Sequence, residues 1–170
     1  MKHTKYFIAT ACIMLAIFSN DSFGQNKTSE KDNSQKISFK NMVDSQQFVF
    51  VAQTASPLRG GFRNLTSSYD VRVRKDTMIS YLPYFGRAYT APIDPAKSGL
   101  DFTSTNFSYT VTPNKKSGWN IVIKPKDKME VQQYAFTVFD NGSASLNVTN
   151  TSKDPISFNG YIKKEERKRK

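Results

Sequence analysis

The chain has 170 residues, and its 25 basic and 14 acidic side chains give a formal net charge of +11. It contains one cysteine, Cys12, and one histidine, His3, and both lie near the N-terminus. A chain that loses this N-terminal segment can form no disulfide, thiolate nucleophile, Ser-His-Asp triad or zinc site of the usual ligand types. We therefore expect no cofactor, no metal and no catalysis of these kinds.

The first 24 residues have the pattern of a secretory signal peptide. A short basic segment, "MKHTK", precedes an apolar run from Tyr6 to Phe18, and Ser22 and Gly24 are small residues at the positions that a signal peptidase recognises. The apolar run is shorter than the roughly 20 residues that a membrane-spanning helix needs. We predict cleavage before Gln25 and an exported protein, periplasmic or secreted, that does not span the membrane.

Cys12 lies in "ATAC", which faintly resembles a lipoprotein cleavage box. The apolar run continues beyond Cys12, so a lipid on this residue would leave the rest of that run on the mature chain. We therefore expect no lipidation at Cys12. Loss of Lys2, Lys5 and Asp21 with the signal peptide lowers the net charge of +11 by one, to +10.

The remaining residues are sufficient for one domain with a single core. Residues 25–36 are polar without an apolar period, so we expect a flexible leader. A loose 3.6-residue period over 37–45 favours one short helix at the start of a domain that spans 37–162. The last segment, 163–170, carries six positive and two negative charges and is predicted to form a solvated basic tail.

From Phe48 onward, apolar and polar residues alternate, which is typical of strands with one buried face. One strand begins near Phe48 and another near Thr77, and the alternation is clear in the segments 68–74, 107–112, 119–124, 134–139, 144–148 and 156–162. Asn141-Gly142, between two of these segments, is the residue pair that a type I′ hairpin turn requires. The chain therefore carries about eight strands joined by short turns.

The fold class that these strands predict is all-β, an antiparallel meander of about eight strands curled into a lipocalin-like barrel with one short N-terminal helix. A single weak helix cannot cover so many strands, and closure buries one face of the sheet around side chains or one small ligand. Outer-membrane strands need about 9–11 residues and aromatic girdles. The strands here are shorter and their outward faces are polar, so a soluble barrel is favoured.

Five segments of the chain resemble domain-of-unknown-function family 4251, exported proteins of Bacteroides-like bacteria. They are "SYLPYFGRAY", "GLDFTSTNFSYTV", "GWNIVIKP", "NGSASLNVT" and "FNGYI", and the likeness covers about Phe48 to Ile162. The resemblance implies a lipocalin-like barrel and an envelope location. It carries over no activity and no catalytic or binding residue.

The segment "SYLPYFGRAY", residues 80–89, is the main candidate site. On one interpretation it is a corner, where Tyr84 and Phe85 plug a barrel end and Arg87 pairs with a carboxylate. On the other it is a binding mouth, where the guanidinium binds a carboxylate, phosphate or sulfate and the rings contact an apolar body. The candidate ligand-binding residues are Tyr81, Tyr84, Phe85, Arg87 and Tyr89.

Our first functional hypothesis is an exported, non-catalytic protein that holds a small amphipathic or anionic molecule at the barrel mouth. The alternative is a filled barrel that docks on envelope glycan, lipid headgroups or a protein partner through its basic surface. Nucleic acid is not expected as a partner because an exported protein rarely meets it. The loop "RGGFR", residues 59–63, is by default flexible, but its glycines could also form a small anion nest.

A third hypothesis is a hydrolase that uses two carboxylates, as glycosidases do. No spacing in the sequence forces two carboxylates together. The candidates are Asp70, Asp94, Asp101, Asp127, Glu130 and Asp154.

Overall fold

The computed structural model describes residues 26–89, 100–128 and 130–166, with side chains from residue 33 onward. The predicted signal peptide, Cys12 and the last four residues of the predicted basic tail lie outside the described residues. The barrel belongs to a compact unit that begins at Ser34.

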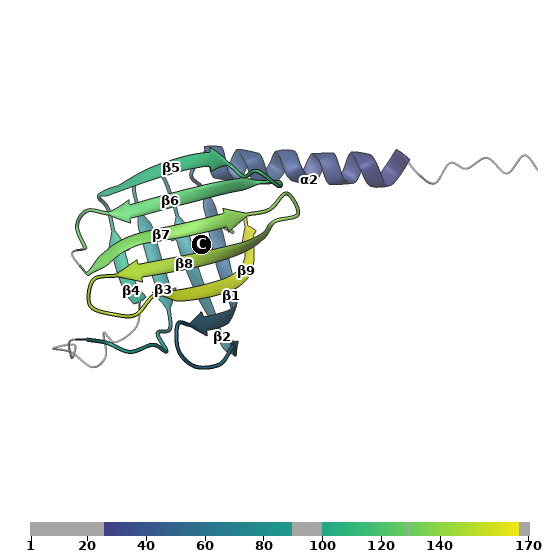
Figure 1. The fold of residues 1–170 in the computed structure, drawn as a ribbon. Coiled ribbons are helices and arrows are strands. Elements are labelled where there is room, and N and C mark those ends of the chain that lie inside the picture. Colours follow the sequence, from purple (N-terminus) through teal and green to yellow (C-terminus); the bar gives the residue numbers. More distant parts are fainter. Residues whose placement is uncertain (1–25, 90–99, 129, 167–170) are drawn as a thin grey trace, which may run out of the picture. The chain divides into compact units, whose positions relative to one another are not determined.

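Within the described residues, one helix is followed by nine strands (Figure 1). They are α2 (Asn26–Asp44), β1 (Phe48–Pro57), β2 (Arg63–Val73), β3 (Met78–Leu82), β4 (Leu100–Ser104), β5 (Phe107–Pro113), β6 (Trp119–Pro125), β7 (Val131–Val138), β8 (Ser143–Asn150) and β9 (Ile156–Lys163). The sheet order is β4-β3-β2-β1-β9-β8-β7-β6-β5, and all neighbouring strands are antiparallel. The first and last strands pair at its centre, so the sheet forms a nearly closed barrel.

The predicted all-β barrel is confirmed, and the strand that sequence analysis did not predict is β4. This strand pairs with β3 from Met78↔Ser104 to Leu82↔Leu100. Leu100 and Phe102 are its only large apolar residues. The alternation from Leu100 to Thr103 covers only four residues, which is the lower limit for recognising a strand from its pattern.

The helix begins at Asn26 rather than near Ile37, so residues 26–36 are helical and not a flexible leader. The helix is anchored near its C-terminal end, where Val43 is fully buried and its carbonyl accepts a hydrogen bond from the Tyr109 hydroxyl at 2.8 Å. Once such an anchored turn exists, each further helical residue adds one hydrogen bond and fixes only one residue, whereas the first turn fixes three for one bond. No described helix is long and apolar enough to cross a membrane.

Aromatic rings occupy the centre of the barrel. Phe136 makes edge-to-face contacts with Phe48 and Phe50, with ring centroids 5.9 and 5.6 Å apart. Phe102 contacts the fully buried ring of Tyr134 in the same way, at 5.8 Å. Edge-to-face pairs at these separations are favourable beyond their buried area. The interior is therefore filled by side chains from both halves of the sheet.

The β7–β8 hairpin turns at the predicted Asn141-Gly142 pair, but the type I′ prediction was wrong. The Gly142 N–H donates to the Phe139 carbonyl at 2.9 Å, and of the pair only Gly142 has a positive φ, 82°. This is a type I turn followed by a glycine bulge. The Asn141 side-chain oxygen accepts a hydrogen bond from the Ser143 N–H at 3.0 Å, which stabilises this conformation.

Candidate functional site

The candidate segment leaves β3 and crosses to the loop between β8 and β9. Pro83 has no N–H and ends the pairing of β3 with its neighbours. The Tyr89 N–H then donates to the Ser152 carbonyl at 2.8 Å, and the Asp154 N–H donates to the Arg87 carbonyl at 3.0 Å. We call residues 83–89 the strap, because these two hydrogen bonds fasten them to the β8–β9 loop (residues 151–155).

Asp154 accepts hydrogen bonds from both tyrosines of the strap, from Tyr89 through its carboxyl and from Tyr84 through its backbone carbonyl. The Tyr89 hydroxyl donates to Asp154 Oδ1, and this hydrogen bond is the main reason why the pKa of Tyr89 is raised. The Tyr84 hydroxyl lies 2.9 Å from the Arg87 carbonyl oxygen and 3.0 Å from that of Asp154, so it shares one proton between them. A Cβ at Gly86 would lie 2.3 Å from the Tyr84 hydroxyl, so only glycine permits this fold-back.

Basic side chains surround the aromatic rings of the strap. The Arg63 guanidinium lies 5.0 Å from the centroid of the Phe85 ring, and the Lys153 ammonium lies 5.2 Å from that of Tyr84. Both separations are within the range of cation–π attraction. Burial is the main cause that lowers the pKa of Lys153.

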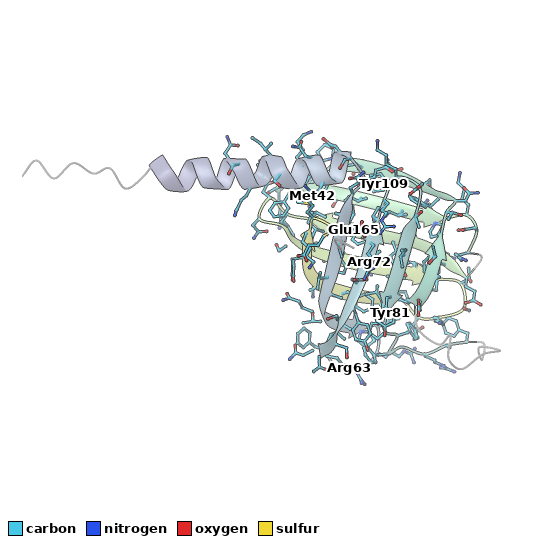
Figure 2. All side chains as sticks on the ribbon, turned by 180° about the vertical axis from the view of Figure 1, so that it is seen from behind. Met42, Arg63, Arg72, Tyr81, Tyr109 and Glu165 are labelled. Carbon is cyan, nitrogen blue, oxygen red and sulfur yellow. The ribbon has the colours of Figure 1, made fainter. Side chains whose placement is uncertain are left out.

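The β1–β2 loop, residues 58–62, lies beside the strap. Leu58 and Phe62 are 64% and 63% exposed, and Arg59 is exposed between them. Arg59 and Arg87 are both close enough to Tyr89 for their charges to oppose the rise in its pKa. Figure 2 shows Arg63 and Tyr81 toward one end of the barrel and Met42 and Tyr109 toward the other.

We call the end formed by the β1–β2 loop, the strap and the β8–β9 loop the loop end. Four of the five candidate residues lie in the strap: Tyr84, Phe85, Arg87 and Tyr89. The fifth, Tyr81, lies on the outer face of β3, 50% exposed, with its ring 5.5 Å from that of Tyr69.

The two interpretations of the candidate segment each describe part of what is seen. Tyr84 and Phe85 are half-buried and pack against the core, as in a structural corner. Arg87 is exposed, and no carboxylate among the described residues forms an ion pair with it. The tyrosine hydroxyls are engaged by the β8–β9 loop, so the exposed rings and cations are what this end offers to a partner.

Sequence analysis missed the contributions of Leu58 and Lys153, and it named Asp154 only as a candidate carboxylate for hydrolysis. "RGGFR" was a weak candidate as an anion nest, and its arginines do lie at the loop end. The pairing of the strap with residues 152–154 joins segments more than 60 residues apart. No local pattern in "TSKDP" indicates that its lysine and aspartate are buried.

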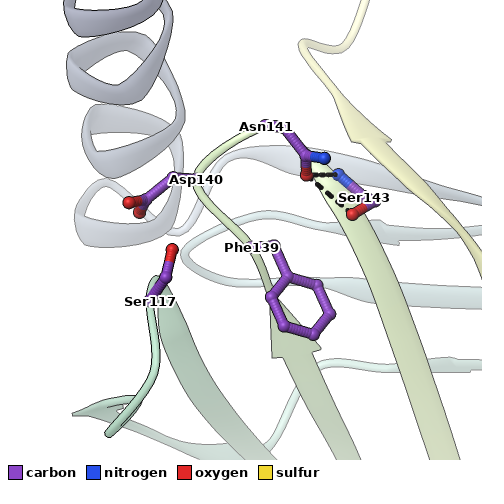
Figure 3. A pocket seen from close by; sticks show the side chains of 5 residues that line it. All are labelled: Ser117, Phe139, Asp140, Asn141 and Ser143. Carbon is purple, nitrogen blue, oxygen red and sulfur yellow. Dashed lines mark hydrogen bonds between the residues drawn. The ribbon is translucent and has the colours of Figure 1, made fainter.

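A shallow pocket of about 480 Å³ lies at the opposite end of the barrel (Figure 3). It is lined by Ser117, Phe139, Asp140, Asn141 and Ser143. Lys36 of α2 forms an ion pair with Asp140 at 2.8 Å and is the main cause that lowers the pKa of this carboxyl. The polar groups of the pocket serve the hairpin turn and the contact with α2, so we assign it a structural role.

Three of the candidate carboxylates for hydrolysis are engaged by other side chains, those of Asp70, Asp127 and Asp154. Asp70 pairs with Arg72 at 3.0 Å. Asp127 accepts a hydrogen bond from Ser104, which is the main cause of its lowered pKa. Asp94 lies outside the described residues. Among the described residues, no group of three or more His, Cys, Asp or Glu side chains could hold a metal ion.

Comparison with known proteins gives one family and one fold. Residues 30–162 match the model of a family described as a domain of unknown function, DUF4251. The fold is similar to that in the crystal structure of a DUF4251 family protein from Bacteroides eggerthii, with a TM-score of 0.55 and 14% sequence identity. The match covers 77% of this chain and 88% of that chain. No curated protein matches the chain.

Proposed function

The chain belongs to the DUF4251 family, and we propose that it is an exported, non-catalytic binding module that recognises an anionic, partly apolar partner through its loop end. One observation carries the proposal: at this end exposed apolar side chains lie among exposed arginines. Leu58, Phe62 and Tyr89 are each more than 60% exposed, and Arg59, Arg63 and Arg87 lie beside them.

The filled interior favours recognition at the surface over a ligand held inside the barrel. A small-molecule pocket normally buries most of its ligand in a cavity of about 300–1,000 Å³. Here the fully buried rings of Phe48, Phe50, Tyr134, Phe136 and Phe158 occupy the centre. This supports the filled-barrel alternative over the first hypothesis of a small molecule held at the barrel mouth.

Arginine and aromatic side chains suit a partner with both an anionic and an apolar part. A guanidinium binds phosphate, sulfate or carboxylate through paired hydrogen bonds, and it is less strongly hydrated than an ammonium group. Exposed rings and Leu58 lose contact with water when they meet an apolar surface, which stabilises the complex. Export would place this partner in the cell envelope or outside the cell.

The test is an NMR titration of the chain recovered after export with monomeric dodecyl phosphate. We expect amide shifts confined to residues 58–63 and 83–89, and weaker binding in Arg87→Ala. Arg74→Ala is the matched control, because Arg74 lies at the opposite end of β2 and pairs with Glu165 at 2.5 Å. Shifts centred on residues 139–143, or no shifts at all, would refute the proposal.

A further inference from the structure

The β1–β2 loop has the composition of a short membrane-docking element. Its sequence, "LRGGF", ends next to Arg63, so two large apolar residues are each followed by an arginine. Leu58 and Phe62 are among the most exposed large apolar side chains of the described residues. Two large apolar side chains exposed together on one turn mark a candidate interaction site.

Two glycines, Gly60 and Gly61, form the tip of this loop. Gly60 has a φ of 103°, a conformation that side-chain-bearing residues rarely adopt. A Cβ at Gly61 would have no atom within 4 Å, so none of the residues that the structure describes covers this position. Figure 1 shows the β1–β2 loop extending from the barrel at the end of β1. The apolar side chains therefore lie on a projecting turn and not in a groove.

Arginines lie at the base of this turn, and aromatic residues accompany them. Arg63 is held over the Phe85 ring, and exposed Arg87 and Tyr89 follow in the same strap. In proteins that bind the membrane interface, apolar side chains enter the boundary between headgroups and acyl chains. Arginines remain at the lipid phosphates and tyrosines lie at the same level.

We infer that the β1–β2 loop docks the barrel on a bilayer that contains anionic phospholipids, with Leu58 and Phe62 entering the interface and Arg59, Arg63 and Arg87 binding lipid phosphates. This inference rests on the proposed function and names the partner of the loop end. Charge complementarity favours it, since the net charge is +11 for the full chain and +10 after the predicted cleavage. A broad fluid surface also accepts a projecting turn, whereas a protein partner would need a matching cavity.

The first experiment measures binding of the chain recovered after export to phosphatidylcholine vesicles with and without phosphatidylglycerol. We expect binding only to the anionic vesicles, and weaker binding at high salt. Arg59→Gln with Arg63→Gln should weaken partition by about 20- to 30-fold. The matched control is Lys115→Gln with Lys116→Gln, which removes two exposed charges from the loop between β5 and β6, at the other end of the barrel.

The apolar contribution is tested separately. Leu58→Ser with Phe62→Ser should reduce partition by about tenfold or more, whereas Ile37→Ser, which changes a 53% exposed residue on α2, should not. In Phe62→Trp, the new indole should be quenched by brominated lipid while Trp119 is not. Circular dichroism spectra equal to that of the wild type show that each variant is folded.

The outcomes separate this inference from the proposed function. Dodecyl phosphate binding at the loop end without vesicle binding overturns the membrane inference and leaves the proposed function standing. An equal loss of vesicle binding in the double arginine and double lysine variants means that binding follows net charge alone, which also overturns the inference. A dimer that is lost in Phe62→Ser, without vesicle binding, assigns the loop to a second copy of the chain. If the chain binds neither dodecyl phosphate nor anionic vesicles, both proposals are refuted.

Discussion

The Tyr134 hydroxyl donates a hydrogen bond to Ser80 Oγ over 2.9 Å, because Ser80 uses its own proton on the Leu100 carbonyl at 2.7 Å. Both side chains are fully buried, one on β7 and the other on β3. The bond therefore joins the two halves of the barrel across its interior. Burial raises the pKa of Tyr134, which keeps this donor protonated.

These two hydrogen bonds predict that substitution of Tyr134 and of Ser80 lowers the stability of the protein by different amounts. Tyr134→Phe leaves Ser80 bonded to Leu100 and should lower the free energy of unfolding by about 1 kcal/mol. Ser80→Ala leaves both the Tyr134 hydroxyl and the Leu100 carbonyl without this partner, and should cost about 1–3 kcal/mol. Urea unfolding measures both values. The double variant should cost less than the sum, and strict additivity would contradict a shared hydrogen bond.

Tyr109 predicts a pH-dependent link between β5 and α2. Its hydroxyl donates to the Val43 carbonyl, and burial first, then nearby Asp44, raises its pKa. Because the folded pKa exceeds the unfolded value of about 10, this contribution is complete below about pH 10 and is lost as the pH rises above it. Tyr109→Phe should therefore be less stable at neutral pH by about 1 kcal/mol, and the gap should narrow in alkali.

The measurement is urea unfolding of wild type and Tyr109→Phe at about pH 8 and about pH 11. Both proteins share every other titrating group, so the difference between them isolates Tyr109. A gap that stays constant over this range would mean that the folded and unfolded pKa values of Tyr109 are equal.

Substitution by alanine should lower stability to different extents at two glycines, Gly160 and Gly61. A Cβ at Gly160 of β9 would lie 1.9 Å from the backbone oxygen of Val51, beside the irregular register of β1. Gly160→Ala must therefore shift a central strand, at a cost of about 1–3 kcal/mol or more. Gly61→Ala meets no atom and should change stability by less than about 1 kcal/mol. Equal thermal midpoints for the two variants would contradict the strand geometry.

Strand patterns were predictable because burial alternates wherever a strand has one inner face. Tyr134, Phe136 and Val138 are all buried on the inner side of β7, as their spacing indicated. The helical residues 26–36 were not predictable, since a polar segment has no apolar period and its helix extends from an end anchored by Val43.

The candidate site was predictable only in part, for a similar reason. The cluster in the strap is visible in the sequence because Tyr84, Phe85 and Arg87 are neighbours. Its attachment to Ser152 and Asp154 is not visible, since these backbone hydrogen bonds depend on how the barrel closes. Sequence analysis therefore found the side chains of the segment but not what holds them.

The attachment of the strap gives two further predictions, the first on the ionisation of Tyr89. Tyr89 has a raised pKa chiefly because its proton is held by the Asp154 carboxylate. Asp154→Asn keeps an acceptor oxygen but removes the charge, so the Tyr89 phenol should ionise at a lower pH than in the wild type. Ultraviolet titration against a Tyr89→Phe background identifies this phenol among the others.

The same contact should control the order of the strap. Tyr89→Phe and Asp154→Ala should both speed hydrogen exchange at the amides of Tyr89 and Asp154, by up to about tenfold, because their backbone hydrogen bonds then open more often. Glu165→Gln, which breaks the ion pair with Arg74 at the other end of the barrel, should leave these two amides unchanged. If exchange in the strap is insensitive to Tyr89 and Asp154, the backbone pairing alone holds the segment. Loss of dodecyl phosphate binding in Arg87→Ala would then report the guanidinium itself and not the order of the strap around it.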